Sequence, residues 1–311
     1  GSPKIVYHGT THSFNEFNQS RGNPHNDMGI AYYFTDELDD VNINYLKEGA
    51  DFTNRIDARA EEIAGELIDD EKYEKYDEAL PEARELAAKE LQGGAENIMP
   101  VYLNMRNPLI VESKGGTEFY IERDYDYYNT IAKDELSRDD YDSDEDYQEA
   151  LEEKATDMYY EDYYPHETGT GVALKESILN IQSLYEDEGL GNLWGELDED
   201  KMLSVDGTIN AYDLIQWFKQ HDDLMNVYDE DGYSVGNDII QKIFKDAGYD
   251  GIIQNAWESF GGGRDMGKPM DGLYEDTKHY IVFEPNQIKS AIGNKGTFNP
   301  DSPIITEMAD F

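Results

Sequence analysis

Negative charge gathers in the middle of this sequence, and its distribution limits how the chain can fold more than any other feature. From residue 117 to 238, aspartate, glutamate and tyrosine alternate with few aliphatic side chains, as at 123–128 and 141–147. Across the whole chain, 69 acidic side chains stand against 25 basic ones, a formal charge of −44. Such acidity often accompanies disorder, but 24 tyrosines and 11 phenylalanines are too many for a solvating tail. We therefore expect a folded and very acidic protein.

Charge and composition exclude several classes of function. Nucleic acids and anionic membrane surfaces repel such a chain, because binding them takes Lys and Arg side chains. We expect no direct nucleic-acid binding and no membrane association, and basic proteins and cations become the natural partners. The absence of cysteine excludes disulfides, thiolate zinc sites and cysteine nucleophiles, and it fits a reducing compartment. The opening Gly-Ser-Pro is typical of a cloning remnant, so this sequence can be a piece of a longer polypeptide.

The composition divides the chain into a strand-rich core and two insertions. The core pieces are residues 4–50, 96–114 and 239–311. A helical insertion at 51–95 and an acidic, tyrosine-rich insertion at 115–238 separate them. We expect the core pieces to fold together.

The hydrophobic pattern within these pieces predicts short elements of both kinds. Runs of β-branched and aromatic residues predict strands, at residues 4–7, 30–35, 98–105, 109–111, 252–253 and 279–284. Apolar residues at three-to-four spacing predict helices, at residues 56–68, 82–91, 147–160, 174–184, 211–221 and 239–244. Pro81 is expected in the first turn of the second helix. The strands show no βαβ rhythm, so the fold class is predicted to be α+β.

Five short motifs follow one another through the core pieces. The first is Tyr-His-Gly-Thr at residues 7–10, where the histidine offers a hydrogen-bonding ring and the glycine lets a ligand approach the bare backbone. Read alone, it is simply a turn with a surface histidine. The others are Gly-Ile-Ala-Tyr-Tyr-Phe-Thr-Asp at 29–36 followed by Tyr45, Asn-Pro-Leu at 107–109, Gly-Tyr-Asp-Gly at 248–251, and an ending that runs from His279 through Gln287 to Pro300.

In this order, the motifs resemble the ADP-ribosyltransferase fold, in the His-Tyr-Glu branch of diphtheria toxin and the poly(ADP-ribose) polymerases. They are most similar to the ADP-ribosyltransferase domains in polyvalent proteins of phages and mobile elements. The resemblance covers about 140 residues, all in the core pieces, and leaves the acidic insertions outside. It implies an α+β, split β-sandwich core interrupted by acidic, mainly helical insertions.

The resemblance also implies roles for residues of the first two motifs. His8 matches the histidine that hydrogen-bonds the nicotinamide-side ribose of NAD. Gly9, with Thr10 beside it, matches the residue whose backbone holds the nicotinamide amide. Tyr33 matches the triad tyrosine, and Tyr45 the second tyrosine, which stacks on the nicotinamide ring. Stacking on tyrosine suits a flat cationic ring, and a fixed histidine and backbone amide orient it.

The third triad position departs from the family pattern. His279 stands where this branch has glutamate, and a neutral imidazole can hydrogen-bond ribose but stabilises positive charge less well than a carboxylate. Glu284 falls on the opposite face of the strand, whereas Glu275 or Gln287 can reach in from loops. Loss of the glutamate in the family accompanies mono- rather than polymeric transfer, and in some members inactivity. Ala31 also replaces the second glycine of the tyrosine motif.

We expect no metal site. Residues 206–209 with Asp213 resemble the second half of a calcium-binding EF-hand loop. The first and third ligand positions of that loop hold Met202 and Ser204, so the loop is broken. The glycine-rich stretch at 260–272 lacks the Gly-Lys-Ser/Thr order of a phosphate-binding P-loop.

The acidic insertion allows three interpretations. It can be a solvated accessory subdomain, such as a salt-adapted one, that needs no partner. It can be a docking surface for a basic host protein. It can also be a nucleic-acid mimic that occupies a DNA-binding protein. Interleaved aromatic residues suit the last two, because aromatics supply contact energy while charge steers association.

The resemblance implies an NAD-dependent mono-ADP-ribosyltransferase that modifies a host macromolecule, with a basic host protein as the favoured acceptor. It would come from a phage or mobile element and act in the bacterial host cytoplasm, after carriage in a virion if packaged. NAD would be its substrate. One alternative is a catalytically silent decoy on the same scaffold, in which glutamate at position 279 would restore nothing. The other is an NAD glycohydrolase, which would release free ADP-ribose without labelling an acceptor.

Overall fold

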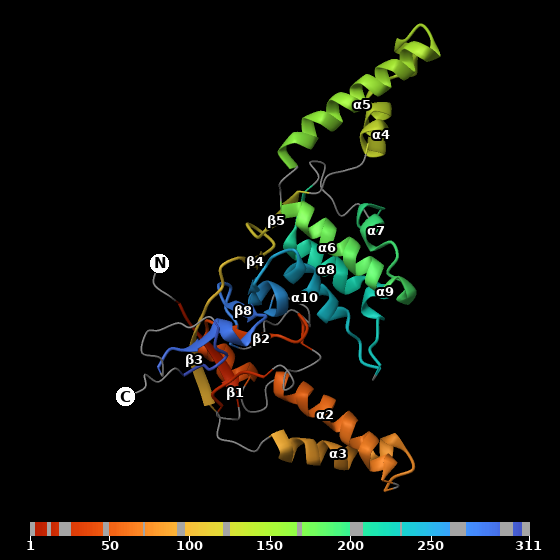
Figure 1. Cartoon of the computed structure of the whole chain (residues 1–311). Helices are drawn as coiled ribbons and strands as arrows, with labels where there is room; N and C mark the ends of the chain where they lie inside the picture. Colours follow the sequence, from red (N-terminus) through yellow and green to blue (C-terminus); the bar gives the residue numbers. More distant parts are fainter. Residues whose placement is uncertain are drawn as a thin grey trace. The chain divides into compact units, whose positions relative to one another are not determined.

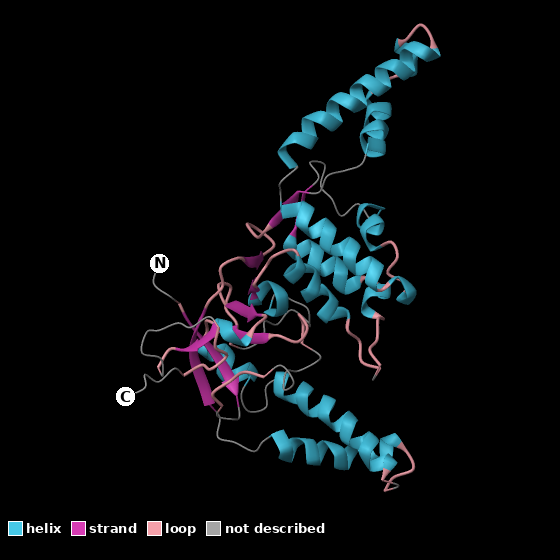
Figure 2. Ribbon diagram, in the orientation of Figure 1, coloured by secondary structure: helices cyan, strands magenta, loops and turns pink. Residues whose placement is uncertain are grey.

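The computed structural model divides the chain into two compact units (Figure 1). Unit 1 comprises residues 1–112 and 249–311, and unit 2 comprises residues 113–248. Strands concentrate in unit 1 and helices in unit 2 (Figure 2). The residues that the structure describes are 4–10, 14–18, 26–45, 50–70, 72–91, 97–120, 125–166, 170–199, 208–230, 232–261, 272–292 and 301–306.

A mixed sheet forms the centre of unit 1. Among the described residues it contains seven strands in the order β4-β7-β8-β2-β1-β3-β9. The strands are β1 (Ile5–Thr10), β2 (Tyr32–Thr35), β3 (Asn97–Leu103), β4 (Pro108–Val111), β7 (Gly251–Asn255), β8 (Lys278–Val282) and β9 (Ile288–Ser290). β4 and β7 run parallel, and the other neighbouring strands pair antiparallel. A mixed sheet accompanied by helical segments confirms the predicted α+β class.

The sheet consists of two well-paired halves that meet between β1 and β2. β1 pairs with β3 over six registered positions, and β2 pairs with β8 over four. Between β1 and β2, by contrast, the register is Tyr7 opposite Thr35. The sheet is therefore least tightly joined at the point where the first two sequence motifs lie.

One face of this sheet carries an apolar core. Side chains that alternate along the strands bury their apolar members on one side. The buried members are Val6, Phe17, Tyr32, Phe34, Val101, Val282, Ile288 and Ile305. These residues come from five strands and two loop segments, so the core joins the start, the middle and the end of the chain within unit 1.

The remaining motifs fasten the edges of the sheet. The carboxylate of Asp250 accepts hydrogen bonds from the backbone N–H groups of Arg106 (2.6 Å) and Asn107 (3.0 Å). The side chain of Gln287 donates to the carbonyls of Asn104 (3.2 Å) and Asp250 (2.7 Å). A Cβ atom at Gly251 would lie 2.6 Å from the carbonyl oxygen of Ile281, so this turn requires glycine. The Asn-Pro-Leu, Gly-Tyr-Asp-Gly and Gln-Ile-Lys-Ser motifs therefore have structural roles.

Two short helical segments follow β2. Helix α1 (Leu38–Asp40) leads directly into a π-helical segment, η2 (Val41–Tyr45). The side chain of Glu37 accepts from the N–H of Asp39 and begins the first turn. Three further short turns in the chain are 3-10 helices at Glu186–Glu188, Arg138–Asp140 and Pro285–Gln287, and a second π-helical segment is Trp257–Gly261.

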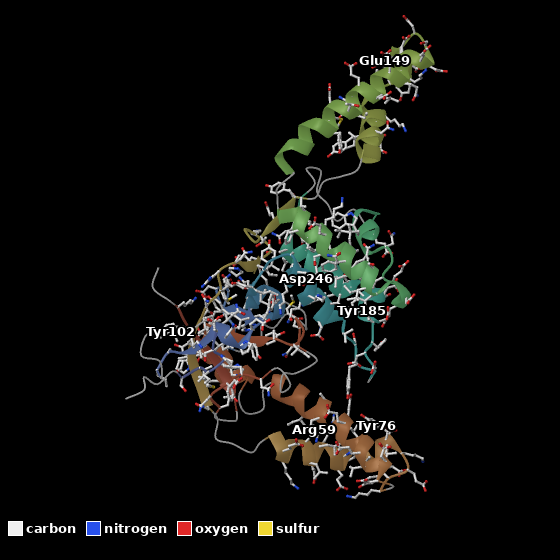
Figure 3. All side chains as sticks on the ribbon, viewed as in Figure 1. Arg59, Tyr76, Tyr102, Glu149, Tyr185 and Asp246 are labelled. Atoms are coloured by element: carbon white, nitrogen blue, oxygen red, sulfur yellow. The ribbon has the colours of Figure 1, made fainter. Side chains whose placement is uncertain are left out.

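Two antiparallel helices occupy the stretch between β2 and β3. They are α2 (Ala50–Asp69) and α3 (Tyr76–Leu91), which lie side by side in Figure 1. Small side chains line their contact, namely Ala60, Ala64, Ala79, Ala83 and Ala87. Arg59, labelled in Figure 3, bridges the pair by bonding Glu62 of α2 (2.6 Å) and Glu90 of α3 (3.1 Å).

Pro81 lies inside α3 rather than in its first turn, where we expected it. The helix begins five residues earlier, at Tyr76. Proline removes one backbone donor from a helix, but the alanine contacts on either side of it bury α3 against α2. Tertiary packing therefore outweighs the local preference.

Unit 2 is mainly helical. Its helices are α4 (Tyr125–Glu135), α5 (Asp144–His166), α6 (Thr170–Leu184), α7 (Leu193–Glu199), α8 (Ala211–Gln220), α9 (Asp222–Met225) and α10 (Gly236–Asp246). β5 (Glu118–Tyr120) and β6 (Thr208–Asn210) form a small antiparallel sheet. Phe244 of α10 packs on Phe119 and Phe218, and Ser177 of α6 donates to the carbonyl of Ile243 (2.7 Å). These contacts give the unit a core of its own.

Helices α4 and α5 form a second helical pair within unit 2. Tyr128 and Ala132 of α4 pack against Leu151 and Ala155 of α5. Outside this contact α5 is strongly acidic, and Figure 3 shows Glu149 on its exposed surface. Unit 2 as a whole carries 36 acidic and 10 basic side chains, a formal charge of −26.

Candidate active site

The histidine of the first motif sits where the two halves of the sheet join. His8 lies on β1, and its Nδ1 lies 2.9 Å from the carbonyl oxygen of Tyr33 on β2. A carbonyl oxygen only accepts, so Nδ1 is the donor of this hydrogen bond. Aromatic contacts to Phe17 and Phe34 hold the ring, with centroids 5.0 and 5.5 Å away. The side chain thus links β1 to β2 beyond the Tyr7–Thr35 pair.

Tyr33 is held by a loop that precedes its own strand. Its hydroxyl donates to the carbonyl of Gly29 (2.9 Å) and accepts from the N–H of Met28 (3.1 Å). Gly29 has a φ of 72°, a left-handed conformation that glycine adopts without strain. The Gly-Ile-Ala-Tyr-Tyr motif therefore fixes the orientation of this tyrosine ring.

His279 lies on β8, the strand next to β2, and is almost completely buried. It is registered opposite Thr35, which is also the residue opposite Tyr7. Its Nε2 lies 2.7 Å from the Oδ2 atom of Asp40 in α1. Only 4% of His279 and 1% of Asp40 are exposed. The three residues that the resemblance assigns to the triad thus lie on three neighbouring strands, β1, β2 and β8.

Gln254 stands beside His279 on the next strand, β7. The two residues are registered opposite each other, so their side chains share a face of the sheet. Gln254 is 2% exposed, and its Nε2 atom has no hydrogen-bond partner among the described residues. Buried side-chain donors are normally satisfied, so this amide is a further polar group to be explained at the site.

The other predicted contact residues lie at the ends of their elements. Gly9 and Thr10 close β1 and pair with Ile98 and Asn97 of β3. Tyr45 is the last residue of η2, and its side chain lies outside the described residues. The glycine-rich stretch at 262–271 and the calcium-loop-like residues 200–207 also lie outside them.

The structure places the side chains considered as substitutes for the triad glutamate. The amide of Gln287 is held by Asn104 and Asp250, and its Oε1 accepts from the N–H groups of Phe283 and Glu284. Reaching the site would break all four bonds, so Gln287 is excluded as a substitute. Glu275 is exposed in a turn. Glu284 lies close enough to Tyr32 to raise its pKa, on the face of β2 opposite to Tyr33 and Thr35.

A group of carboxylates follows β2 and ties its end to β8. Asp36 accepts from Lys4 Nζ (2.5 Å), from the Lys278 N–H (2.8 Å) and from the Tyr280 hydroxyl (3.3 Å). Asp39 accepts from the Tyr274 hydroxyl (2.8 Å), and this hydrogen bond raises the pKa of Tyr274. Among these carboxylates, the side chain of Asp40 is the buried one.

Sequence reasoning missed Asp40 and Gln254. Four carboxylates lie between residues 36 and 40, and nothing local distinguishes the buried one from its neighbours. Gln254 lies in an ordinary strand pattern. Only the pairing of β7 and β2 with β8 brings these side chains to His279.

The pairing register sets these groups on two faces of the sheet. His279, Gln254 and Tyr33 share a face with Thr35. His8 lies with Val6 and Phe34 on the face that carries the apolar core. No group of three acidic or histidine side chains among the described residues could hold a metal ion. In the same part of the chain, no helix combines the length and apolar character needed to cross a bilayer.

This large mixed sheet with its accompanying helices is an α+β fold of the ADP-ribosyltransferase type. The chain matches the family described as ADP-ribosyltransferase in polyvalent proteins over residues 1–177 and 174–298, and it belongs to that family. The match also covers the acidic insertion at 115–238. The five sequence motifs lie in the core pieces and do not extend into this insertion. No curated protein and no solved structure gives a significant match.

Proposed function

We propose that this protein transfers a single ADP-ribose unit from NAD to a host macromolecule. Membership of the ADP-ribosyltransferase family supports the reaction class. The observation that carries the proposal is the placement of His8, Tyr33 and His279 on three adjacent strands, with Thr35 registered between β1 and β8. In the reaction, the bond between ribose and nicotinamide breaks, its electron pair leaves with nicotinamide, and the acceptor bonds to the ribose carbon.

His8 is proposed to orient the nicotinamide-side ribose. Its Nδ1–H donates to the Tyr33 carbonyl, and Nε2 is proposed to bond a ribose hydroxyl. The Gly9 backbone, with Thr10 next to it, would hold the nicotinamide amide, and Tyr45 would stack on the ring. Tyr33, the predicted triad tyrosine, would line the site between the ribose and the nicotinamide ring. Fixed groups of this kind lower the barrier by holding the substrate near its reactive geometry.

The acceptor is proposed to be a basic protein of the bacterial host cytoplasm. Unit 2 carries 36 acidic against 10 basic side chains, and a surface of that charge attracts basic partners. Residues 115–238 would then serve as a docking module, and residues 4–50, 96–114 and 239–311 as the catalytic core. Binding to such an acceptor would weaken steeply as ionic strength rises, because salt screens exposed charges. The same dependence is expected of a decoy that binds a basic partner, so transfer itself must be measured.

The test is an incubation with NAD labelled in its adenylate part and a bacterial lysate. We expect label on a discrete acceptor band, and loss of that label with the His8→Ala/Tyr45→Ala double variant. A Glu85→Ala variant, changed on the exposed face of α3 outside residues 115–238, serves as a folded control that keeps the NAD site. Free ADP-ribose without a labelled acceptor would indicate a glycohydrolase. If no label is transferred and no NAD is consumed, the protein is a catalytically silent scaffold and the transferase proposal is refuted.

A further inference from the structure

Lys289 lies in the last sequence motif, and its side chain is completely buried. It belongs to β9, the last strand in the order of the sheet, and 0% of it is exposed. Its Nζ donates to the backbone carbonyls of Ser302 (2.6 Å) and Ile304 (3.0 Å). A buried ammonium group is costly unless it is hydrogen-bonded, and an apolar side chain would be buried without that cost. Lys289 therefore has a role that the burial of apolar surface does not explain.

The carbonyls that Lys289 binds belong to a short segment beside β9, residues 301–306, which we call the strap. The backbone N–H of Ser290 in β9 donates to the carbonyl of Ile305 across 2.9 Å. The N–H of Ile305 donates in turn to the carbonyl of Asn15, also across 2.9 Å. The strap therefore joins β9 to the chain segment that follows β1.

The apolar pattern of the strap does not fix its register. Ile304 and Ile305 are neighbours, and either isoleucine could fill the same place in an apolar core. In the structure Ile305 is 1% exposed and Ile304 is 45% exposed. Successive residues of an extended segment point to opposite sides, so a slip by one residue would exchange the two. Lys289 distinguishes the registers, because its ammonium group binds two carbonyls that are two residues apart.

The segment that the strap holds carries aromatic side chains that pack on His8. Phe14 and Phe17 contact the His8 ring edge-on, with centroids 6.3 and 5.0 Å away. The two phenylalanine rings also contact each other, with centroids 4.8 Å apart. Phe17 and Ile305 belong to the same apolar cluster. A change in the register of the strap would therefore change the surroundings of His8.

We propose that Lys289 is a positioning residue for His8, because it fixes the register of the strap and thereby the place of Phe14 and Phe17. This inference rests on the proposed function, in which His8 orients the nicotinamide-side ribose of NAD. Lys289 acts through the strap, and it neither contacts NAD nor takes part in bond cleavage. The Gln-Ile-Lys-Ser motif would then connect the edge of the sheet to the proposed NAD site.

The first experiment replaces Lys289 by methionine, which keeps the length of the side chain and removes the ammonium group. The NMR resonances of the His8 ring protons are assigned by their absence from the spectrum of His8→Gln. We expect them to move in Lys289→Met, because they depend on where the rings of Phe14 and Phe17 lie. The kcat/KM for nicotinamide release should fall about tenfold or more, since misplacing an orienting group by about 1 Å costs up to about 100-fold.

Ala83→Leu is the matched control, because it overfills the contact of α2 and α3 and leaves the strap unchanged. It should lower stability without moving the His8 resonances or changing kcat/KM. The resonances of His221, whose ring packs on Trp217 in unit 2 (5.0 Å), should stay in place in both variants. A folded Lys289→Met protein with wild-type His8 resonances and wild-type kcat/KM would overturn the proposal.

The second experiment restores the register without the lysine. Glu16 and Ile304 are exposed partners in an antiparallel bridge, and the Cα atoms of such partners lie about 4.5–5.5 Å apart, within the range of a disulfide. The chain has no cysteine of its own, so Lys289→Met/Glu16→Cys/Ile304→Cys contains a single pair. When oxidised, this variant should recover the His8 resonances and most of kcat/KM. When reduced, it should behave as Lys289→Met does. A disulfide that forms without this recovery would overturn the proposal.

Lys289→Met removes buried hydrogen bonds, so a milder pair of variants covers the case in which it does not fold. Ile305→Val removes one methyl group from the buried side of the strap, and Ile304→Val removes one from the exposed side. The His8 resonances should move with Ile305→Val alone, and unchanged resonances in that variant would overturn the proposal. If the wild-type protein neither binds NAD nor releases nicotinamide, the proposed function falls. The resonances of the free protein still decide whether Lys289 positions His8.

Discussion

His8 donates from Nδ1 to the backbone carbonyl of Tyr33 across 2.9 Å, and this bond continues the link between β1 and β2 after their registered pair ends. The His8 side chain thus supplies a hydrogen bond between β1 and β2 where the backbone pairing of the two strands has ended. One ring nitrogen is therefore structural, and the proposed contact with NAD falls to the other. The two nitrogens can be tested separately, because Asn and Gln mimic them one at a time.

The first prediction contrasts His8→Asn with His8→Gln. Asn can place an N–H near the position of Nδ1, so it should keep the bond to Tyr33 and most of the stability. Gln reaches the position of Nε2, so it should keep more NAD binding but lose about 1 kcal/mol of unfolding free energy. Urea unfolding and NAD titration measure the two quantities. If both variants bind NAD as wild type does, His8 does not contact NAD.

The second prediction concerns Gln287, which satisfies four backbone groups with one buried amide. Gln287→Leu has a similar volume but leaves two N–H groups and two carbonyls without this partner. We expect a loss of about 3 kcal/mol in the free energy of unfolding. Urea denaturation measures it. A loss below about 0.5 kcal/mol, the range of ordinary surface changes, would show that water replaces the amide.

The third prediction concerns the pH dependence of stability through Tyr32. Burial first, and then Glu284 and Glu16, raise the pKa of Tyr32 to about 12 from its ordinary value of 10.0. The neutral phenol is favoured in the folded state, so its contribution is complete below pH 10 and is lost as pH rises through the folded-state pKa. Tyr32→Phe should show a shallower fall in stability between these two pH values than wild type.

Tyr32→Phe should also not destabilise the protein at neutral pH. The Tyr32 hydroxyl has no hydrogen-bond partner among the described residues, so removing it leaves nothing unsatisfied there. The free energy of unfolding should stay the same or rise by about 1 kcal/mol. A clear loss at neutral pH would mean that the hydroxyl has a partner.

The fourth prediction tests the small-residue contact of α2 and α3. Ala83 is completely buried between the two helices, whereas Glu85 on the same helix is exposed. Ala83→Leu overfills the contact and should lower the free energy of unfolding by about 1–3 kcal/mol. Glu85→Leu is the matched control and should change it by less than about 0.5 kcal/mol. Equal effects of the two substitutions would contradict close packing of the helices.

Much of the fold could be predicted because the relevant signals are local. Apolar alternation predicts β1, β2 and β4, and three-to-four spacing predicts α2, α6 and α8. β9 was missed because Ile288-Lys289-Ser290 is short and contains a lysine. Lys289 is buried there because its Nζ donates to the carbonyls of Ser302 (2.6 Å) and Ile304 (3.0 Å), partners that no local pattern indicates. β5 and β6 were missed because each has three residues and they pair across about 90 intervening positions.

The candidate site was predictable only in part, for a similar reason. Family motifs indicate His8, Tyr33 and His279, because each lies in a run of characteristic neighbours. Asp40 and Gln254 carry no such run, and their importance comes from pairing with β8. The sequence therefore predicts histidine in the third triad position, whereas no local pattern indicates the buried carboxylate of Asp40 that contacts it.

The most direct test of the account is nicotinamide release from NAD labelled in the nicotinamide ring, measured with bacterial lysate as the acceptor source. Bond cleavage between ribose and nicotinamide is common to transfer and hydrolysis, so it tests the site itself. The account predicts release by the wild-type protein and its loss, in a folded protein, with His8→Ala/Tyr45→Ala. No release by folded wild-type protein, or equal release by that variant, would contradict it.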